Sequence, residues 1–181
     1  MENKKLEYKM CFFTLSQLSD IDKGIQCGYA ALIYANDFGK TEQFINYIND
    51  WNEWIIFNGK TTGNKICGID RIGYINQIVN QLDDNNINYS SYFEKKLNFA
   101  LTTICFIVDE RIYNKFNYPE FVDYLIDKIS IDNKLESSEF VKLKITKLDD
   151  LILKYNTYYN VGGEQNVFLR NLLVDKELIW Q

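Results

Sequence analysis

The chain has 181 residues, a formal net charge of −5 and no histidine. Its length favours one compact domain, and without histidine it can form neither a Ser-His-Asp or Cys-His nucleophile nor a histidine metal site. The acidic balance argues against a dedicated nucleic-acid binder, because such proteins gain much of their affinity by neutralising phosphates.

The expected elements alternate between strands and helices. Short aromatic and β-branched runs predict strands, and apolar residues at helical spacing predict helices. In chain order these are strand 8–15, helix 22–38, a helix from residue 41, strand 54–57, helix 69–83, strands 89–93 and 102–108, and helix 120–129. Strands separated by helices imply crossovers. We therefore predict an α/β fold with a mixed β-sheet and helices on both faces, in the order β-α-α-β-α-β-β-α.

The first helix carries recognisable start and stop signals. Ser19 or Asp20 would cap its N-terminus, because their side-chain oxygens can accept from free backbone N–H groups. Gly24 and Gly28 would allow another backbone to approach closely. Gly39 would end the helix.

The last quarter of the chain has a different character. It begins as a polar, irregular stretch, followed by an alternating segment at 141–145 and helical patterns at 147–158 and 164–173. We therefore expect an α/β domain over residues 1–131 and a mostly helical C-terminal extension over residues 132–181, packed on the same domain.

Targeting signals and cofactor motifs are lacking in this sequence. There is no N-terminal apolar stretch and no apolar run near the ~18 residues of a membrane span. The four cysteines form no Cys-x-x-Cys pair, so we expect reduced thiols and a cytoplasmic protein with no metal, no cofactor and no membrane partner. The 20 Asn and 22 Ile are typical of an AT-rich genome, such as that of a low-GC bacterium or its phage.

The start of the first helix is one candidate site. Asp20, Lys23, Gly24, Gln26 and Tyr29 cluster there. A helix N-terminus presents unpaired N–H groups and a partial positive charge, which suit a phosphate. The alternative is an ordinary capped helix.

The loop after the second strand is a second candidate site. It contains Asn58, Lys60, Thr61 and Thr62 between an apolar strand and a helix. Ligands in open α/β sheets sit at the carboxyl ends of strands. The glycine and lysine spacing is not that of a Walker A loop, and the alternative is a surface turn.

Two further segments carry polar groups. Glu94 and Asn98 lie between the third and fourth strands, where Glu94 could serve as an acid, a base or an orienting group. The loop 161–166 holds two glycines before the last helix, and Arg170 could reach a partner or a phosphate. A solvated hairpin and an ordinary helix start are the alternatives.

Over residues 6–130 the sequence resembles the type 2 peptidyl-tRNA hydrolases. That family begins its first helix with a Lys- and Gly-rich start followed by Ala-Gln-Cys-x-His-Ala. It then has a strand ending in lysine and an Asp-Ala-Gly-Arg-Thr turn before the last strand. Here Gln26 and Cys27 match the Gln-Cys pair, while Tyr29 stands where the family has histidine and Lys23 lies near the family lysine.

The remaining family positions have diverged. Asn58 or Lys60 falls near the strand-end lysine, Glu94 falls where the family has aspartate, and Asn98 stands for the threonine. The Asp-Ala-Gly-Arg-Thr string is absent. The resemblance implies a hydrolase-like cleft with eroded catalytic identities.

Three functions remain open at this point. The first is binding of a phosphate-bearing nucleotide-type ligand without turnover, as in a phage-encoded protein that sequesters a host nucleotide signal. The second is peptidyl-tRNA hydrolysis, in which Glu94 would activate water, Lys23 or Lys60 would hold phosphate, and Gln26 and Thr61 would position the ester carbonyl. The third is a protein-interaction module or homo-oligomer that uses the acidic C-terminal extension.

Overall fold

The structure is a computed structural model of the chain, and it describes residues 5–66, 69–114, 116–118, 161–174, 176 and 178–180. The chain forms two compact units: one contains Met1–Glu110 and Leu172–Gln181, and the other contains Arg111–Asn171. The expected helix at 120–129, the elements at 141–158, the boundary at residue 131 and Cys67 all lie outside the described residues.

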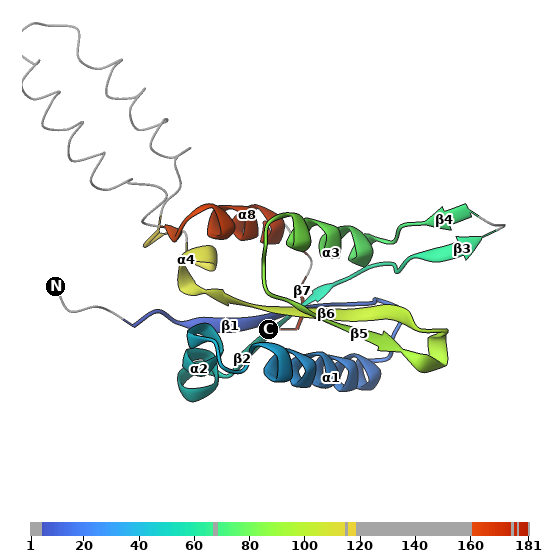
Figure 1. The fold of residues 1–181 in the computed structure, drawn as a ribbon, viewed down its shortest axis with the longest axis horizontal. Helices are drawn as coiled ribbons and strands as arrows, with labels where there is room; N and C mark the ends of the chain where they lie inside the picture. The colour runs from blue at the N-terminus through green and yellow to red at the C-terminus, as the bar shows by residue number, and fades with distance from the viewer. Residues whose placement is uncertain are drawn as a thin grey trace, which may run out of the picture. The chain divides into compact units, whose positions relative to one another are not determined.

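The first unit is built on a five-stranded sheet (Figure 1). The strand order is β5-β6-β1-β2-β7, in which β1 runs parallel to β2 and every other neighbouring pair is antiparallel. The strands are β1 Tyr8–Thr14, β2 Glu53–Asn58, β5 Ser90–Glu94, β6 Ala100–Asp109 and β7 Leu178–Trp180. The predicted α/β class with a mixed sheet is confirmed.

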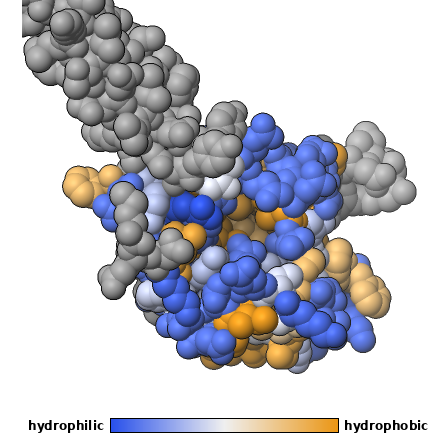
Figure 2. All heavy atoms as spheres, turned by 60° about the vertical axis from the view of Figure 1, so that its left-hand side comes forward, coloured by the Kyte–Doolittle hydropathy of each residue, from blue (hydrophilic) through white to orange (hydrophobic). Residues whose placement is uncertain are grey.

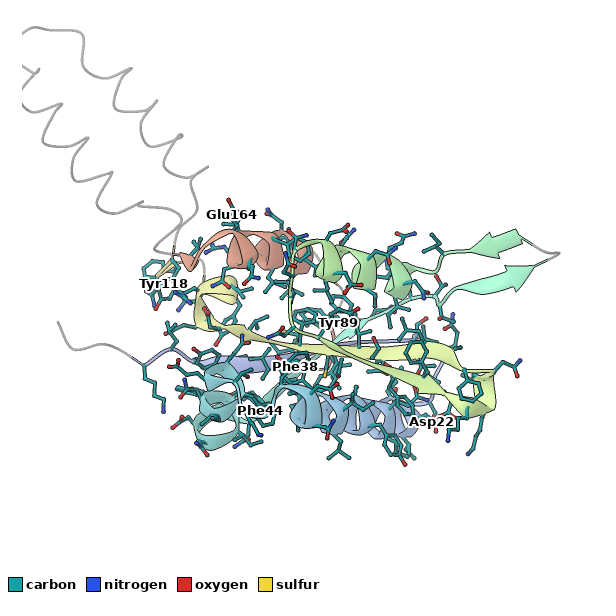
Figure 3. The ribbon with its side chains drawn as sticks, viewed as in Figure 1. Asp22, Phe38, Phe44, Tyr89, Tyr118 and Glu164 are labelled. Carbon is teal, nitrogen blue, oxygen red and sulfur yellow. The ribbon has the colours of Figure 1, made fainter. Side chains whose placement is uncertain are left out.

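Helices cover both faces of this sheet (Figure 1). On one face lie α1 (Asp20–Phe38) and α2 (Glu42–Asn46), which continues into a π-helical turn at Tyr47–Trp51, and on the other lies α3 (Tyr74–Asp84). Asp22 and Phe38 mark the two ends of α1 in Figure 3, where Phe44 of α2 lies near Phe38. No helix within the described residues has both the length and the apolar character that a membrane crossing requires.

The core between α1 and the sheet follows from the strand alternation. Met10 and Phe12 of β1 point to the α1 side, where they pack with Cys27, Ala30 and Tyr34 of that helix. Period-2 alternation in the strand and helical spacing in α1 present these side chains to one another. Burial of this shared face fixes α1 over the sheet.

The region between β2 and α3 differs from the expectation. A short antiparallel hairpin, β3 Asn64–Ile66 and β4 Ile69–Arg71, occupies part of what was expected to be a loop and the first turn of a helix. The helix expected from residue 69 therefore begins five residues later, at Tyr74, with Gly73 as its N-cap. Three-residue strands are too short to produce a clear alternation, so the apolar pattern of the sequence does not separate them from the helix that follows.

The glycines of α1 also act differently from the expectation. Gly39 ends the helix with right-handed backbone angles, and a Cβ there would meet the Ala35 carbonyl oxygen at 2.2 Å. Glycine is therefore needed at residue 39 because a side chain would clash there, and not because the backbone is left-handed. At Gly24 and Gly28 a Cβ would meet nothing within 4 Å, so no backbone of the described chain approaches them.

Most residues of α4 (Glu110–Tyr113) and α8 (Glu164–Leu173) belong to the second unit, and α8 confirms the helix expected at 164–173. Arg170 is 1% exposed, and its Nη1 donates to the backbone carbonyls of Arg111 and Tyr118. The expectation that Arg170 would reach a partner or a phosphate is therefore wrong, because its guanidinium holds two backbone segments of the unit together.

Candidate functional site

The carboxyl ends of three strands share one edge of the sheet. β1 and β2 are parallel, and β1 and β5 are both antiparallel to β6. Thr14, Asn58 and Glu94, the last residues of β1, β2 and β5, therefore lie at the same edge. In this way the sheet gathers the segments that the sequence had singled out separately.

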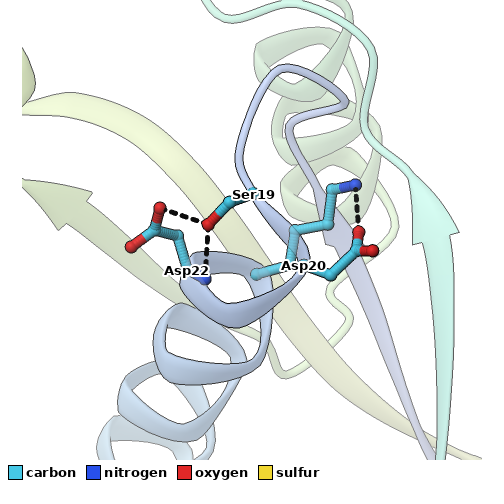
Figure 4. A network of polar contacts seen from close by, with 4 residues as sticks. Ser19, Asp20 and Asp22 are labelled. Carbon is cyan, nitrogen blue, oxygen red and sulfur yellow. Dashed lines mark hydrogen bonds and ion pairs between the residues drawn. The ribbon is translucent and has the colours of Figure 1, made fainter.

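The first turn of α1 begins close to this edge, and its polar contacts are shown in Figure 4. Ser19 caps the helix, since its Oγ accepts from the backbone N–H of Asp22. The Lys23 ammonium lies 3.1 Å from Asp20, and the Lys23 side chain is 12% exposed while that of Asp20 is 71% exposed. The Lys23 side chain is therefore mostly buried, while the carboxylate of its counterion Asp20 is exposed to solvent.

Four side chains from α1 and β5 form the centre of the candidate site, here called the edge cluster: Gln26, Tyr29, Tyr92 and Glu94. Gln26 Nε2 and the Tyr92 hydroxyl lie 3.4 Å and 3.5 Å from Glu94 Oε2. The rings of Tyr29 and Tyr92 stack with centroids 5.0 Å apart. The contacts to Oε2 are long, so this carboxylate oxygen remains able to accept stronger hydrogen bonds.

Gln26 is an unusual member of the cluster. Its side chain is 4% exposed, and the carbonyl oxygen Oε1 is buried with no hydrogen-bond partner among the described residues. The ionised Glu94 can only accept, so the amide nitrogen faces it and the oxygen points elsewhere. An unsatisfied buried acceptor costs roughly 1–3 kcal/mol, and costs of this kind are tolerated most often where function requires the group.

Tyr92 links the carboxylate to the aromatic pair. Desolvation raises the pKa of its hydroxyl, and the negative charge of Glu94 raises it further. The hydroxyl therefore keeps its proton through the neutral range and donates toward Glu94.

A row of polar side chains crosses the sheet beside the cluster. Tyr92 is aligned with Thr103, Thr103 with Thr14, and Thr14 with Asn58. Thr14 and Thr103 are fully buried, and their hydroxyl oxygens lie 3.0 Å apart. Sequence reasoning missed Tyr92, Thr14 and Thr103, although a polar residue at a core-facing position of an apolar strand is a signal for such a row.

The loop after β2 is largely occupied with its own structure. Thr61 binds the N-terminus of α3 from outside the helix, since its Oγ1 accepts from the N–H of Tyr74 and its carbonyl from that of Ile75. The Lys60 backbone N–H donates to Asn58 Oδ1, and its ammonium lies over the Tyr74 ring. Thr62 is half-buried beside Gly73, where a Cβ would strike it. Of this loop, Lys60 offers an exposed cation to a ligand.

Two expected site residues lie apart from the edge cluster. Asn98 is exposed and adopts left-handed angles with φ 53° in the turn between β5 and β6. Its place is explained by that turn, since Asn is one of the residues that tolerates this conformation. Gly24 is exposed on α1.

Replacing Gln26 with Leu should leave the free energy of unfolding unchanged or raise it by about 1 kcal/mol, because the change removes a buried unpaired oxygen. Ser90 is the matched control, since it is also buried but its hydroxyl donates to the Ala30 carbonyl at 2.7 Å. Ser90→Ala should lower stability by roughly 1 kcal/mol. Chemical denaturation measures both, and a loss for Gln26→Leu as large as that for Ser90→Ala would make Gln26 a structural residue.

Comparison of the chain with protein-family models, with curated proteins and with solved structures finds no match.

Proposed function

We propose that the chain binds a nucleotide-type ligand carrying phosphate at this edge of the sheet, and that it holds the ligand without turnover. The observation that carries the proposal is the edge cluster, in which a stacked tyrosine pair, a carboxylate and a buried amide meet beside Lys23. Aromatic rings, hydrogen-bonding groups and a cation are the three features that nucleotide recognition needs.

The base of the ligand stacks on the tyrosine pair in this proposal. Tyr29 is exposed over nearly half of its surface and is already stacked on Tyr92, so it offers a flat surface to a base. Stacking of a base on an aromatic side chain contributes roughly 1–3 kcal/mol. Glu94 Oε2 accepts from N–H or O–H groups of the base or the sugar, since its contacts within the chain are long, while Oε1 accepts from the backbone N–H of Lys96 at 3.0 Å.

The phosphate is assigned to lysine side chains and not to the first turn of α1. Asp20 and Asp22 place two carboxylates in that turn, and Ser19 already accepts from one of its N–H groups. A phosphate would instead replace the exposed carboxylate of Asp20 as the counterion of Lys23. Hydrogen bonds to charged groups contribute more than those between neutral ones, and Lys60 lies at the same edge as a second cation.

Isothermal titration with nucleoside mono- and diphosphates and cyclic dinucleotides tests the proposal, and at least one should bind at micromolar concentration and be recovered unchanged. Tyr29→Ala and Lys23→Ala should each weaken that binding by about tenfold or more. Phe116→Ala and Lys5→Ala are the controls, because Phe116 is 95% exposed outside the cluster and Lys5 pairs with Asp50 away from this edge. Heat-free titrations across the whole panel would refute nucleotide binding.

A second candidate function is hydrolysis of the ester between peptide and tRNA. The contact between Glu94 and Gln26 favours it, because a carboxylate beside an amide could orient water toward an ester carbonyl that the amide polarises. An active protein should release free tRNA from peptidyl-tRNA, and Glu94→Gln should abolish release while Glu42→Gln retains it. Intact peptidyl-tRNA after prolonged incubation with excess protein would exclude this activity.

A further inference from the structure

The outward face of α1 carries large apolar side chains that nothing in the described chain covers. Ile21 and Leu32 are 77% and 68% exposed, and Ile25 is exposed over half of its surface. Figure 2 shows an apolar patch between hydrophilic side chains on the lower side of the molecule, where Figure 1 places α1 and α2. A contiguous apolar surface of this kind marks an interaction site more often than single exposed residues do.

A groove runs along this face. It has a volume of about 480 Å³ and lies between α1 on one wall and the α2 segment with β2 on the other. Gly28, Ala31 and Ala35 form the small-residue side of the α1 wall, and Ile48 and Trp54 stand on the opposite wall. The groove is therefore lined mostly by apolar groups.

The glycines of α1 fit the same picture. Glycine weakens a helix interior relative to alanine, yet a Cβ at Gly24 or Gly28 would meet nothing within the described chain. A partner that covers this face of α1 could therefore approach the helix closely at these two glycines.

We propose that a second copy of this chain covers it, with the two α1 helices packed antiparallel about a two-fold axis at Gly28. Residues whose numbers sum to 56 then face each other. This pairing places each large side chain against a small one: Ile21 against Ala35, Ile25 against Ala31, and Leu32 against Gly24.

The spacing along the helix supports this pairing. Ile21, Gly28 and Ala35 recur every seven residues, which keeps them on one stripe of α1 over almost its full length. A two-fold interface must be self-complementary, because each copy presents the same surface. The alternation of large and small residues about Gly28 meets that requirement.

The charges are compatible with the same arrangement. Asp20 faces Asn36 of the other copy, Asp22 faces the position of the buried Tyr34, and Asp37 faces Ser19. No two carboxylates of α1 are opposed. Asp20 is in addition already paired with Lys23 of its own chain, which reduces the negative charge at each end of the helix pair.

Sedimentation velocity of the full chain over a concentration series tests the dimer, which should have twice the 21.4 kDa mass of the chain. Leu32→Glu should raise the dissociation constant by about a hundredfold or more, because it buries an unpaired charge in the interface. Ile72→Glu is the matched control, since Ile72 is also exposed but lies outside α1. Both sites are exposed, so thermal melts should show that each variant folds.

A cysteine pair tests the position of the two-fold axis. In a Cys67→Ser background, Gly28→Cys should form an intermolecular disulfide rapidly under a mild oxidant, while Asn36→Cys should not, because only residue 28 meets its own copy. A monomer at every concentration, a dimer that survives Leu32→Glu, or equal cross-linking of the two cysteine variants would overturn the proposal.

Discussion

Raising the pH from about 8 to about 11 is expected to unfold the chain. Burial raises the pKa of the Cys27 and Cys105 thiols to about 12 and also raises that of Cys11. Burial raises the pKa of the Tyr34 hydroxyl in the same way. All four groups stay protonated in the folded core at a pH where their counterparts in an unfolded chain have ionised.

The sign follows from proton linkage. Above the unfolded thiol pKa, near 8.5, the unfolded chain binds fewer protons than the folded chain, so the free energy of unfolding falls as the pH rises. The stabilisation is fully present below that pH and is lost progressively toward pH ~12. Each buried thiol contributes a slope of about −1 kcal/mol per pH unit in this range. Three thiols together would remove about 9 kcal/mol between pH 8 and pH 11, which is comparable to a typical stability of 5–15 kcal/mol.

Denaturant titrations at about one-unit pH steps measure this slope. Cys27→Ala removes one buried thiol and should make the slope shallower by about 1 kcal/mol per pH unit. An exposed site offers the control, since Lys40→Ala leaves every buried thiol and Tyr34 in place. A free energy of unfolding that stays constant between pH 8 and pH 11 would contradict burial of these thiols.

Phe12→Ala should lower the free energy of unfolding by about 3–5 kcal/mol, the cost typical of truncating a buried aromatic side chain. Phe12 is fully buried on β1, its ring centroid lies 4.7 Å from that of Trp54, and it packs in the core beneath α1. Thermal or chemical denaturation measures the loss.

Phe116→Ala removes the same side chain from a site that is 95% exposed and should change stability by less than about 0.5 kcal/mol. If the two variants lost equal stability, the packing of β1 against α1 would be wrong.

The sequence predicted the main elements of the fold because their periodicity is strong. Strand β1 and helix α1 differ from the expected ranges by one or two residues at their ends. The β3–β4 hairpin and β7 were missed, since each of these strands has three residues. The pairing of β7 with β2 joins segments more than 120 residues apart, and nothing in the local sequence specifies that contact.

The sequence also predicted only part of the candidate site. Gln26, Tyr29 and Glu94 were chosen separately from two distant segments, and the structure brings all three into one cluster. Asn98 and Thr61 were chosen for their chemistry, but the turn and the start of α3 account for their places. The sequence identifies Tyr92, Thr14 and Thr103 only as strand residues, because their alignment across the sheet depends on register.

Mapping of backbone amide shifts by ¹⁵N NMR, with the nucleotide that binds most tightly as titrant, tests the proposed site most directly. We expect saturable shifts confined to the edge of the sheet: the first turns of α1, the residues after β2, and the end of β5. The same titration with Tyr29→Ala should need about tenfold more nucleotide to saturate those shifts in a folded protein. Saturable shifts that avoid Gln26, Tyr92 and Glu94 and gather elsewhere would contradict a ligand site at this edge.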